Sequence, residues 1–421
     1  MEIRVSGQSF TTSAVLGDID AYAALIAKAK AVPGHCLCLC TTPARKLVIR
    51  TVRKRNFLAV WPHDGHNHHY ACPFYRDQED ANSASNGVLP AVKETAHGFE
   101  IATEFQLERV FRANGDISPE DPDDAVVNTP TGQRPSRSRM GLLGVIHHLW
   151  KESGLNTWGF KWTRDWWRVT QALLPVMEQG KLGSRPMPDC MFLVPELHPG
   201  RMPAIERAWG EFKDSLVPRE GLARLGLILG EAMLMERSRY GFRLTLRHFP
   251  PFLYFSDELR GKLATSYPKA YHRIGNREKQ TVIALCLVEL TANGNLSVTD
   301  AALMPTSRHF IPIDSSYEAA LADLLVTQNR SFIKPLSVRS GESALPDFIL
   351  TDTSPEHVLE VFGMNTHDYV ERKIAKLAIY KAEGKPVWSW EPSISDEPPK
   401  LPSSVRETRT PNGSRIGGAA A

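Results

Sequence analysis

The sequence predicts an α+β protein of several domains. Its 421 residues leave room for more than one hydrophobic core, and 42% hydrophobic with 23% charged residues is ordinary for a globular protein. In the last quarter of the chain, segments with helical spacing of apolar residues alternate with short β-rich runs, and near the start cysteines and histidines gather. We expect an N-terminal zinc-ribbon-like β-hairpin module, a mixed α/β middle and a C-terminal core in the order αβββαβ.

Changes in composition set the expected domain boundaries. Residues 114–139 are rich in Pro, Asp and Ser and nearly free of apolar side chains, which predicts a linker. It separates an N-terminal module, residues 1–113, from a middle region, residues 140–305. The αβββαβ core is expected over residues 306–392, and the Pro/Ser/Gly-rich residues 393–421 are typical of a disordered tail.

The N-terminal module contains four of the six cysteines. Three of them alternate in HCLCLC (35–40), and alternation along a strand places side chains on one face. A predicted hairpin over residues 46–62 then returns the chain to a histidine-rich run that ends at Cys72. In a long chain without a secretory leader, clustered cysteines indicate a metal site more often than disulfides.

Zinc prefers four sulfur or nitrogen ligands in a tetrahedral arrangement. We expect Cys38, Cys40, Cys72 and one histidine to form a structural Cys₃His site, with His68 as the first choice and His69 as the second. The alternative is a set of buried strand cysteines beside a solvated histidine run. Two basic runs, one around the predicted hairpin and one in the predicted linker, could contact phosphates or be solvated surface.

The middle region combines helices with β-rich runs. Helices are predicted over residues 140–152 and 165–177, joined by a tryptophan-rich turn that either packs in the core or contacts nucleic acid. The strands are predicted at residues 190–197, 224–236, 240–249, 281–290 and 295–305. They imply a sheet or a small barrel. The chain has no repeat, P-loop, nucleophile elbow or dinucleotide fingerprint, which excludes the commonest nucleotide-driven and acyl-transfer functions.

The C-terminal elements follow from the period of the apolar residues. The expected order is a helix over 315–328, strands over 331–339, 346–350 and 357–363, a helix over 368–381 and a strand over 386–390. Ser315 or Ser316 is a suitable N-cap for the first helix. In the second helix Val370, Ile374 and Leu377 form an apolar stripe that we expect to face the core.

Two acidic residues of this region suit a cation site. Asp347 opens one strand of a predicted hairpin and Glu360 lies in its partner, so both carboxylates can meet at one edge. Carboxylate oxygens are the ligands that Mg²⁺ prefers. Such a site suits phosphodiester hydrolysis, since the ion polarises a phosphoryl oxygen and activates a water molecule.

The succession PDF, EVFG and YVERKIAKLAIY resembles the PD-(D/E)XK superfamily of restriction-endonuclease-like nucleases over about 80 residues. The resemblance implies metal ligation by Asp347 and Glu360, assisted by the helix acid Glu318. The superfamily's lysine stands two residues after the second acid, where this chain has Phe362. Some members carry that lysine on the next helix. Those members indicate Lys376, or Lys373 in reserve.

The whole chain also resembles an uncharacterised bacterial family, domain of unknown function 1173, which is often encoded on plasmids and integrative elements. The matching segments are LLGVIHHLWKESGLNTW (142–158), DWWRV (165–169) and FLVPEL (192–197). That resemblance implies no established activity.

From these patterns we expect a cytoplasmic, metal-dependent nuclease that acts on DNA with Mg²⁺ or Mn²⁺ and contains a structural Zn²⁺. A net charge of +3 permits a nucleic-acid partner without demanding one, and no stretch is long and apolar enough to span a membrane. The alternative is a non-catalytic nucleic-acid or protein-binding component of mobile-element machinery with a degenerate nuclease fold. An ammonium group of Lys373 or Lys376 beside the two carboxylates favours the enzyme.

Overall fold

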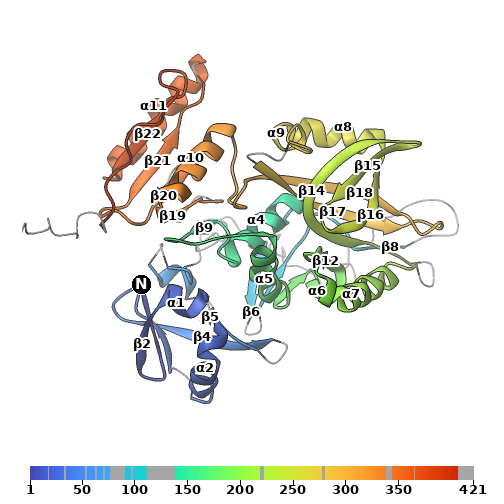
Figure 1. The fold of residues 1–421 in the computed structure, drawn as a ribbon, viewed down its shortest axis with the longest axis horizontal. Helices are drawn as coiled ribbons and strands as arrows, with labels where there is room; N and C mark the ends of the chain where they lie inside the picture. Colours follow the sequence, from blue (N-terminus) through green and yellow to red (C-terminus); the bar gives the residue numbers. More distant parts are fainter. Residues whose placement is uncertain are drawn as a thin grey trace, which may run out of the picture. The chain divides into compact units, whose positions relative to one another are not determined.

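The computed structural model describes residues 1–17, 19–32, 35–52, 55–61, 64–69, 72–75, 91–95, 98–110, 138–218, 222–276, 280–337, 344–364 and 366–405, and the elements and contacts below belong to these residues. The chain forms two compact units, one of Met1–Leu155 and Thr163–Asp314, the other of Asn156–Trp162 and Ser315–Ala421. The fold is mixed α+β with several sheets, as predicted (Figure 1). The predicted linker lies outside the described residues as far as residue 137.

The first sheet is N-terminal and antiparallel. Its strands, in the order β2-β1-β3-β4-β5, are β1 (Glu2–Val5), β2 (Gln8–Thr11), β3 (Cys36–Cys38), β4 (Arg45–Val52) and β5 (Arg55–Val60). The short helices α1 (Thr12–Gly17), η1 (Ile19–Tyr22) and α2 (Ala23–Lys30) accompany it. The predicted hairpin is β4–β5, with Leu47 opposite Val60. Because β3 pairs with both β1 and β4, the cysteine strand lies in the middle of the sheet.

A second group of elements surrounds two helices, α4 (Leu142–Glu152) and α5 (Trp166–Met177). The short strands here are β6 (Val92–Thr95), β7 (Gly98–Ile101), β10 (Gly180–Leu182) and β11 (Arg185–Pro186) in one sheet, and the pair β8 (Glu108–Val110) and β13 (Leu222–Arg224). The indole N–H groups of Trp150 and Trp166 donate to the carbonyls of Phe310 and Val194 at 3.0 and 2.9 Å. Both rings are buried, so these tryptophans form core and do not read nucleic acid.

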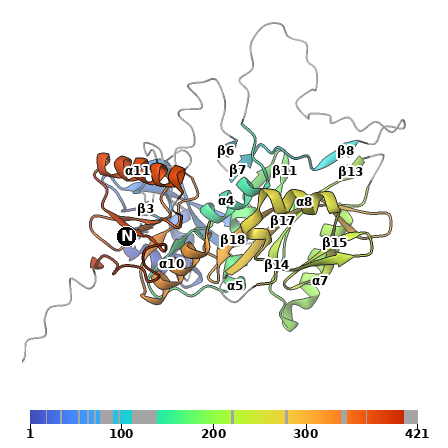
Figure 2. The same ribbon diagram turned by 90° about the horizontal axis from the view of Figure 1, so that it is seen from above.

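The strands of the middle region close into a small barrel, which decides between the two predicted alternatives. The strands are β14 (Gly226–Ser238), β15 (Gly241–Leu246), β16 (Phe249–Phe255), β17 (Gln280–Leu290) and β18 (Leu296–Ser307). They follow the order β14-β15-β16-β18-β17, and β17 pairs back to β14, while β12 (Met191–Leu193) extends one edge of β14. Figures 1 and 2 show these strands curling together with α8 (Asp257–Ser266) beside them. The remaining helices of this unit are α6 (Met187–Cys190), η3 (Pro199–Arg201), α7 (Met202–Ser215) and α9 (Pro268–Tyr271).

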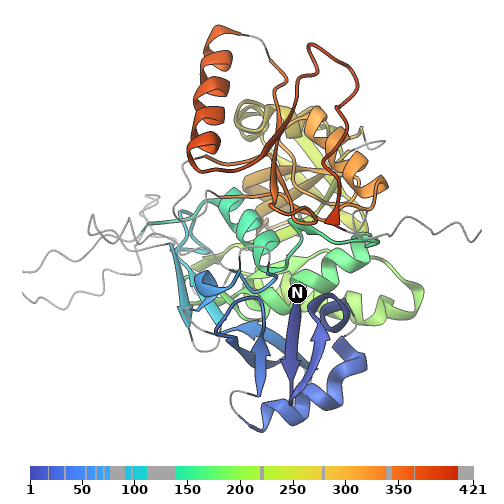
Figure 3. The same ribbon diagram turned by 90° about the vertical axis from the view of Figure 1, so that its left-hand side faces the viewer.

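The second unit has the predicted order of elements. They are α10 (Ser316–Thr327), β19 (Phe332–Ile333), β20 (Phe348–Leu350), β21 (His357–Val361), α11 (His367–Ala382) and β22 (Val387–Trp390). Ser315 caps α10 by accepting a hydrogen bond from the Glu318 amide at 3.1 Å. The sheet order is β22-β21-β20-β19-β9, in which β9 (Thr157–Trp158) comes from a segment that the sequence assigned to the middle region. In Figures 1 and 3 α10 and α11 lie on either side of the strands.

The orientation of α11 differs from the prediction. Val370 and Ile374 were expected to face the core, but their side chains are 38% and 62% exposed, whereas Tyr380 is fully buried. The helix turns the face that holds Tyr369, Lys376 and Tyr380 toward the sheet because polar groups there find partners on β21. Apolar periodicity alone therefore gave the wrong buried face.

Residues 393–405 also differ from the disorder expected for them. The indole N–H groups of Trp388 and Trp390 donate to the carbonyls of Lys400 and Ser395 at 3.1 and 2.9 Å, and the side chain of Leu401 is buried. The two indoles thus tie this segment to β22. Within the described ranges, no helix is both long enough and apolar enough to cross a bilayer.

Candidate functional site

The cysteines and the histidine singled out in the N-terminal sequence converge at the end of β3. The side chains of Cys38, Cys40, His68 and Cys72 place their ligand atoms within 4.8 Å of one another. The Sγ atoms of Cys38 and Cys72 are 3.4 Å apart, and the Nδ1 atom of His68 lies 3.3 Å from the Cys40 sulfur and 3.7 Å from the Cys72 sulfur. This cluster could hold a metal ion such as zinc.

Local contacts build the loop that brings His68 to the cysteines. Asp64 precedes the short helix η2 (Gly65–Asn67) and forms an ion pair with Arg45 of β4 at 3.4 Å. The same carboxylate accepts a hydrogen bond from the side-chain amide of Asn67 at 2.9 Å. His69, the second choice from the sequence, contributes its backbone N–H to the Cys40 sulfur at 3.4 Å, and its ring is not a member of the cluster.

The electrostatics of the cluster favour a bound cation. A hydrogen bond from Cys72 lowers the pKa of Cys38 to about 4, so this thiol ionises readily. The Cys38 hydrogen bond and burial raise the pKa of Cys72, because a second thiolate beside the first is unfavourable. A divalent ion would stabilise both thiolates. Cys36 lies outside the cluster, and burial raises the pKa of its thiol to about 12, as expected for a neutral core residue.

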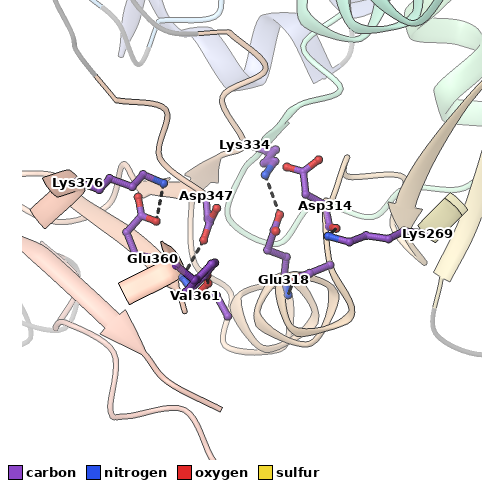
Figure 4. Close-up of polar contacts among 10 residues, drawn as sticks. Lys269, Asp314, Glu318, Lys334, Asp347, Glu360, Val361 and Lys376 are labelled. Atoms are coloured by element: carbon purple, nitrogen blue, oxygen red, sulfur yellow. Dashed lines mark hydrogen bonds and ion pairs between the residues drawn. The ribbon is translucent and has the colours of Figure 1, made fainter. Parts of the chain in front are cut away.

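The second candidate site lies in the C-terminal unit and is drawn in Figure 4. Phe348 pairs with Leu359 across β20 and β21, so the next antiparallel positions, Asp347 and Glu360, stand opposite each other. The Oδ2 atom of Asp347 accepts a hydrogen bond from the Val361 amide at 2.8 Å. The structure therefore brings together the two carboxylates that the sequence pattern singled out.

Glu360 is held by two groups of α11. The ammonium group of Lys376 lies 2.7 Å from one carboxylate oxygen, and the Tyr380 hydroxyl donates to the other at 2.7 Å. The carboxylate is 1% exposed, whereas the Lys376 side chain is 26% exposed and Asp347 is half-buried. Lys376 thus pairs with the buried Glu360 carboxylate while part of its own side chain remains accessible to solvent.

Burial and proximity set the charges of this site. Burial and the Glu360 carboxylate raise the pKa of Asp347 to about 6, while the ammonium groups of Lys334 and Lys376 act in the opposite direction. Burial likewise raises the pKa of Glu360. Positive charge stabilises the ionised form of each buried acid, and a proton, an ammonium group or a metal ion can supply it.

Glu318 belongs to the same electrostatic group through a lysine that the sequence did not reveal. Its carboxylate pairs with the ammonium group of Lys334 at 2.7 Å, and both side chains are almost fully buried. The Lys334 ammonium also lies 5.4 Å from the centre of the Phe348 ring. The available signal was a lysine inside the apolar run SFIKPL, where a charged residue needs a partner.

Lys373, the reserve candidate from the sequence, points elsewhere. Its ammonium group pairs with Glu391 at 2.6 Å and lies 5.0 Å from the centre of the Phe362 ring. The structure therefore places Lys376, and not Lys373, beside the acids of the candidate site.

The carboxylates do not form a ready-made metal cage. Among the described residues, the Cys/His cluster is the group of three or more metal-ligating side chains whose ligand atoms converge. In the C-terminal unit lysine ammonium groups occupy the positions next to Glu318 and Glu360. A metal ion at Asp347 and Glu360 would have to displace the Lys376 ammonium from its carboxylate oxygen.

Comparison with known protein families gave a match over most of the chain. The model of a family described as "Protein of unknown function (DUF1173)" covers residues 10–393. No curated protein and no solved structure matches the chain.

The Cys/His cluster predicts a metal content that can be measured. We expect purified protein to carry about one zinc ion per chain and Cys72→Ser to lose it, because three ligands cannot retain a structural ion at the same affinity. Structural zinc contributes on the order of 10 kcal/mol to folding, so the N-terminal sheet should also unfold more readily. Elemental analysis and limited proteolysis measure both effects.

Cys36→Ser is the matched control, since Cys36 is as buried as Cys72 and lies on β3 beside the cluster but is not a member of it. Metal-free protein with freely titratable thiols would contradict the site.

Because Glu318 and Lys334 form a buried ion pair, we expect that substitutions at the two residues do not change the free energy of unfolding independently. Lys334→Met should lower the free energy of unfolding by roughly 3–5 kcal/mol, because it removes the ammonium group that pairs with a buried carboxylate. The double variant with Glu318→Gln should be less destabilised than the sum of the two single changes. Urea unfolding followed by tryptophan fluorescence measures this difference. Strictly additive effects would show that the pair is not energetically coupled.

Proposed function

Because the chain belongs to that family of unknown function, its activity has to be inferred from its own sites, and we propose that its C-terminal unit is a metal-dependent nuclease that hydrolyses phosphodiester bonds of DNA. The observation that supports this most is that the Lys376 ammonium of α11 lies 2.7 Å from Glu360, which stands opposite Asp347 across β20 and β21. These are the acids and the helix lysine that the sequence pattern indicated. Their meeting depends on the register of β20 and β21 and on the face of α11.

The charge of the site is compatible with a divalent cation. Asp347, Glu360 and Glu318 bring three carboxylates, while Lys334 and Lys376 bring two ammonium groups, so one negative charge remains when all are ionised. Asp347 and Glu360 would hold Mg²⁺ or Mn²⁺, which supplies Lewis-acid stabilisation of a phosphoryl oxygen and an activated water molecule. Burial, and then the neighbouring Glu360 carboxylate, raise the pKa of Asp347 despite the ammonium groups of Lys334 and Lys376, so a cation at this site would stabilise its ionised form.

The residues of this chain have separate roles in the proposal. Tyr380 fixes one oxygen of Glu360 and leaves the other to Lys376. The partly exposed Lys376 ammonium can leave that oxygen and offset the negative charge that develops on the transferring phosphoryl group. The buried Lys334 holds Glu318 on α10 and adds positive charge near both acids. Phe362 cannot perform either task, so the ammonium group must come from the helix.

The alternative is a binding component of mobile-element machinery whose nuclease fold is degenerate. The observation that favours it is that Glu318 and Glu360 are already neutralised by lysines, with no third ligand converging among the described residues. In that case Lys376 is a structural cation that holds α11 on the sheet. The two functions differ in whether Lys376 affects a chemical step or only stability.

Cleavage assays distinguish the two functions. Single- and double-stranded DNA and RNA are incubated with Mg²⁺, Mn²⁺ or a chelator, and the products are resolved on denaturing gels. We expect metal-dependent cleavage of DNA that Asp347→Asn and Glu360→Gln abolish, because each removes a ligand charge at nearly constant volume.

Lys376→Ala should lower the cleavage rate by about 10²–10³-fold, roughly 3–4 kcal/mol, if its ammonium stabilises the transition state. Lys373→Ala is the comparison. Lys373 lies one turn before Lys376 on α11, but its ammonium group pairs with Glu391, away from the acids of the site. This variant should retain most of the rate. Thermal unfolding of each variant shows whether a loss of activity reflects a loss of fold. Cleavage by Lys376→Ala at the parent rate would rule out the proposed role, and no cleavage by the parent under any condition would favour the binding component.

A further inference from the structure

The strands of the barrel in the first unit are connected in an order that distinguishes it from a simple meander. Strands β14, β15 and β16 form an antiparallel meander, α8 and α9 follow β16, and β17 and β18 form a hairpin. The third strand pairs in parallel with the fifth, and the first pairs with the fourth. This is the five-stranded Greek-key connectivity of the OB-fold, in which the second and third strands and the loops between strands one and two and four and five form the face that binds oligonucleotides or oligosaccharides. A fold does not determine a function, so the side chains on that face decide.

The corresponding face of this barrel contains a groove of about 610 Å³. Residues 237–240, at the end of β14 and in the β14–β15 turn, line one side of the groove, and Thr291 and Asn295 of the β17–β18 loop line another. Arg243 of β15 and Tyr254 of β16 form the floor and face each other across the strand pair. The groove therefore coincides with the strands and loops that the connectivity brings together.

Aromatic rings project from this face without packing in the core. Tyr240 at the tip of the β14–β15 turn is 84% exposed, and Phe252 on β16 is 36% exposed. The next residue along β16, Leu253, points into the barrel core. Burial therefore does not account for the rings of Tyr240 and Phe252. Exposed aromatic faces are stacking surfaces for nucleobases.

Arginine side chains lie on these rings. The guanidinium of Arg239 is 5.1 Å from the centre of the Tyr240 ring, and that of Arg243 is 4.3 Å from the Phe252 ring. Guanidinium groups stack on aromatic and base planes and bind phosphate through paired N–H donors. Alternating arginines and aromatic rings suit a chain that carries a base and a phosphate at each step.

The acidic residues near the groove do not cancel this positive charge. Glu236 pairs with Arg243 at 2.8 Å, and Asp257 pairs with Arg237 at 3.7 Å, where both side chains are more than 60% exposed. Exposed ion pairs contribute little, so a phosphate can replace either carboxylate as the partner. With Arg239 included, the face carries one more positive than negative charge among these five residues. A neutral sugar chain could stack on the rings and accept hydrogen bonds from the arginines, but it would gain no attraction between opposite charges.

We propose that this barrel binds single-stranded nucleic acid across β15 and β16, with bases stacked on Tyr240 and Phe252 and phosphates bound by Arg237, Arg239 and Arg243. The site is distinct from the carboxylates of the second unit, and the proposal does not rest on nuclease activity. A single strand fits because its bases are free to stack, whereas those of a duplex are not.

Binding of fluorescein-labelled dT15 to the full chain tests the proposal by fluorescence anisotropy. The measurement uses the Glu360→Gln background without added Mg²⁺ or Mn²⁺, so that cleavage cannot occur while the zinc expected at the Cys/His cluster is retained. A failed nuclease proposal therefore leaves the result unaffected. We expect Tyr240→Ala to weaken binding by about 5- to 100-fold, the range measured for one base–aromatic stack. Tyr240→Phe keeps the ring and should bind like the parent. Because Tyr240 is almost fully exposed, its replacement does not disturb the core.

Two further variants show whether binding uses the proposed arginine contact and whether it is confined to the barrel. Arg239→Ala should reduce the slope of log affinity against log salt by about 0.7, the value for one phosphate contact on a single strand. Trp61→Ala is the matched control outside the barrel, since its exposed ring also carries a cation, the Lys46 ammonium at 5.7 Å. It should leave affinity and slope unchanged.

The competing ligands are included as separate arms. Labelled U15 shows whether the strand can be RNA, and a 15-base-pair duplex and a neutral glucan of similar length should bind far more weakly than dT15. Parent-like affinity of both Tyr240→Ala and Arg239→Ala would overturn the proposal. Binding of the glucan or of the duplex in preference to both single strands would overturn it as well.

Discussion

The structure of the C-terminal unit depends on how the Glu360 carboxylate is compensated. A carboxylate in the interior is costly unless hydrogen bonds and an opposite charge replace its water. Lys376 and Tyr380 are four residues apart on α11, so they share one face of the helix and reach both oxygens of the same carboxylate. This contact fixes the rotation of the helix about its axis. The exposure of Val370 and Ile374 is the consequence, because the polar face outweighs the apolar stripe.

Local patterns in the sequence predicted much of the architecture. The order of elements in the C-terminal unit, the β4–β5 hairpin and the meeting of Asp347 with Glu360 follow from apolar periodicity and turn signals over short distances. The Cys/His cluster was predicted from the kinds of residue present and from the hairpin that returns the chain to them, and His68 and Cys72 do meet Cys38 and Cys40. Alternation along β3 did not settle the membership, because Cys36 shares the face of Cys38 but lies outside the cluster.

Features that depend on distant contacts could not be predicted. The closure of the barrel requires β14 to pair with β17, about 50 residues later, and no local signal specifies that pairing. The partner of Lys334 is a glutamate on another element, so its burial was not visible in the sequence. The face of α11 was predicted wrongly because hydrophobic spacing counts apolar side chains and ignores a polar group that has a buried partner.

The strand β9 has a consequence for how this protein can be divided. In β9, Thr157 pairs with Ile333 and Trp158 pairs with Phe332. Asn156 exchanges hydrogen bonds with the backbone of Lys334. The chain therefore enters the second unit, leaves it and returns. No single cut separates the two units into self-contained pieces. A fragment that begins at α10 would expose the edge of β19, which is a template for pairing with other chains. During synthesis, the segment that completes this sheet leaves the ribosome more than 150 residues before the helix that begins the rest of the unit. Recombination between related genes would therefore have to exchange both segments to transfer an intact C-terminal domain.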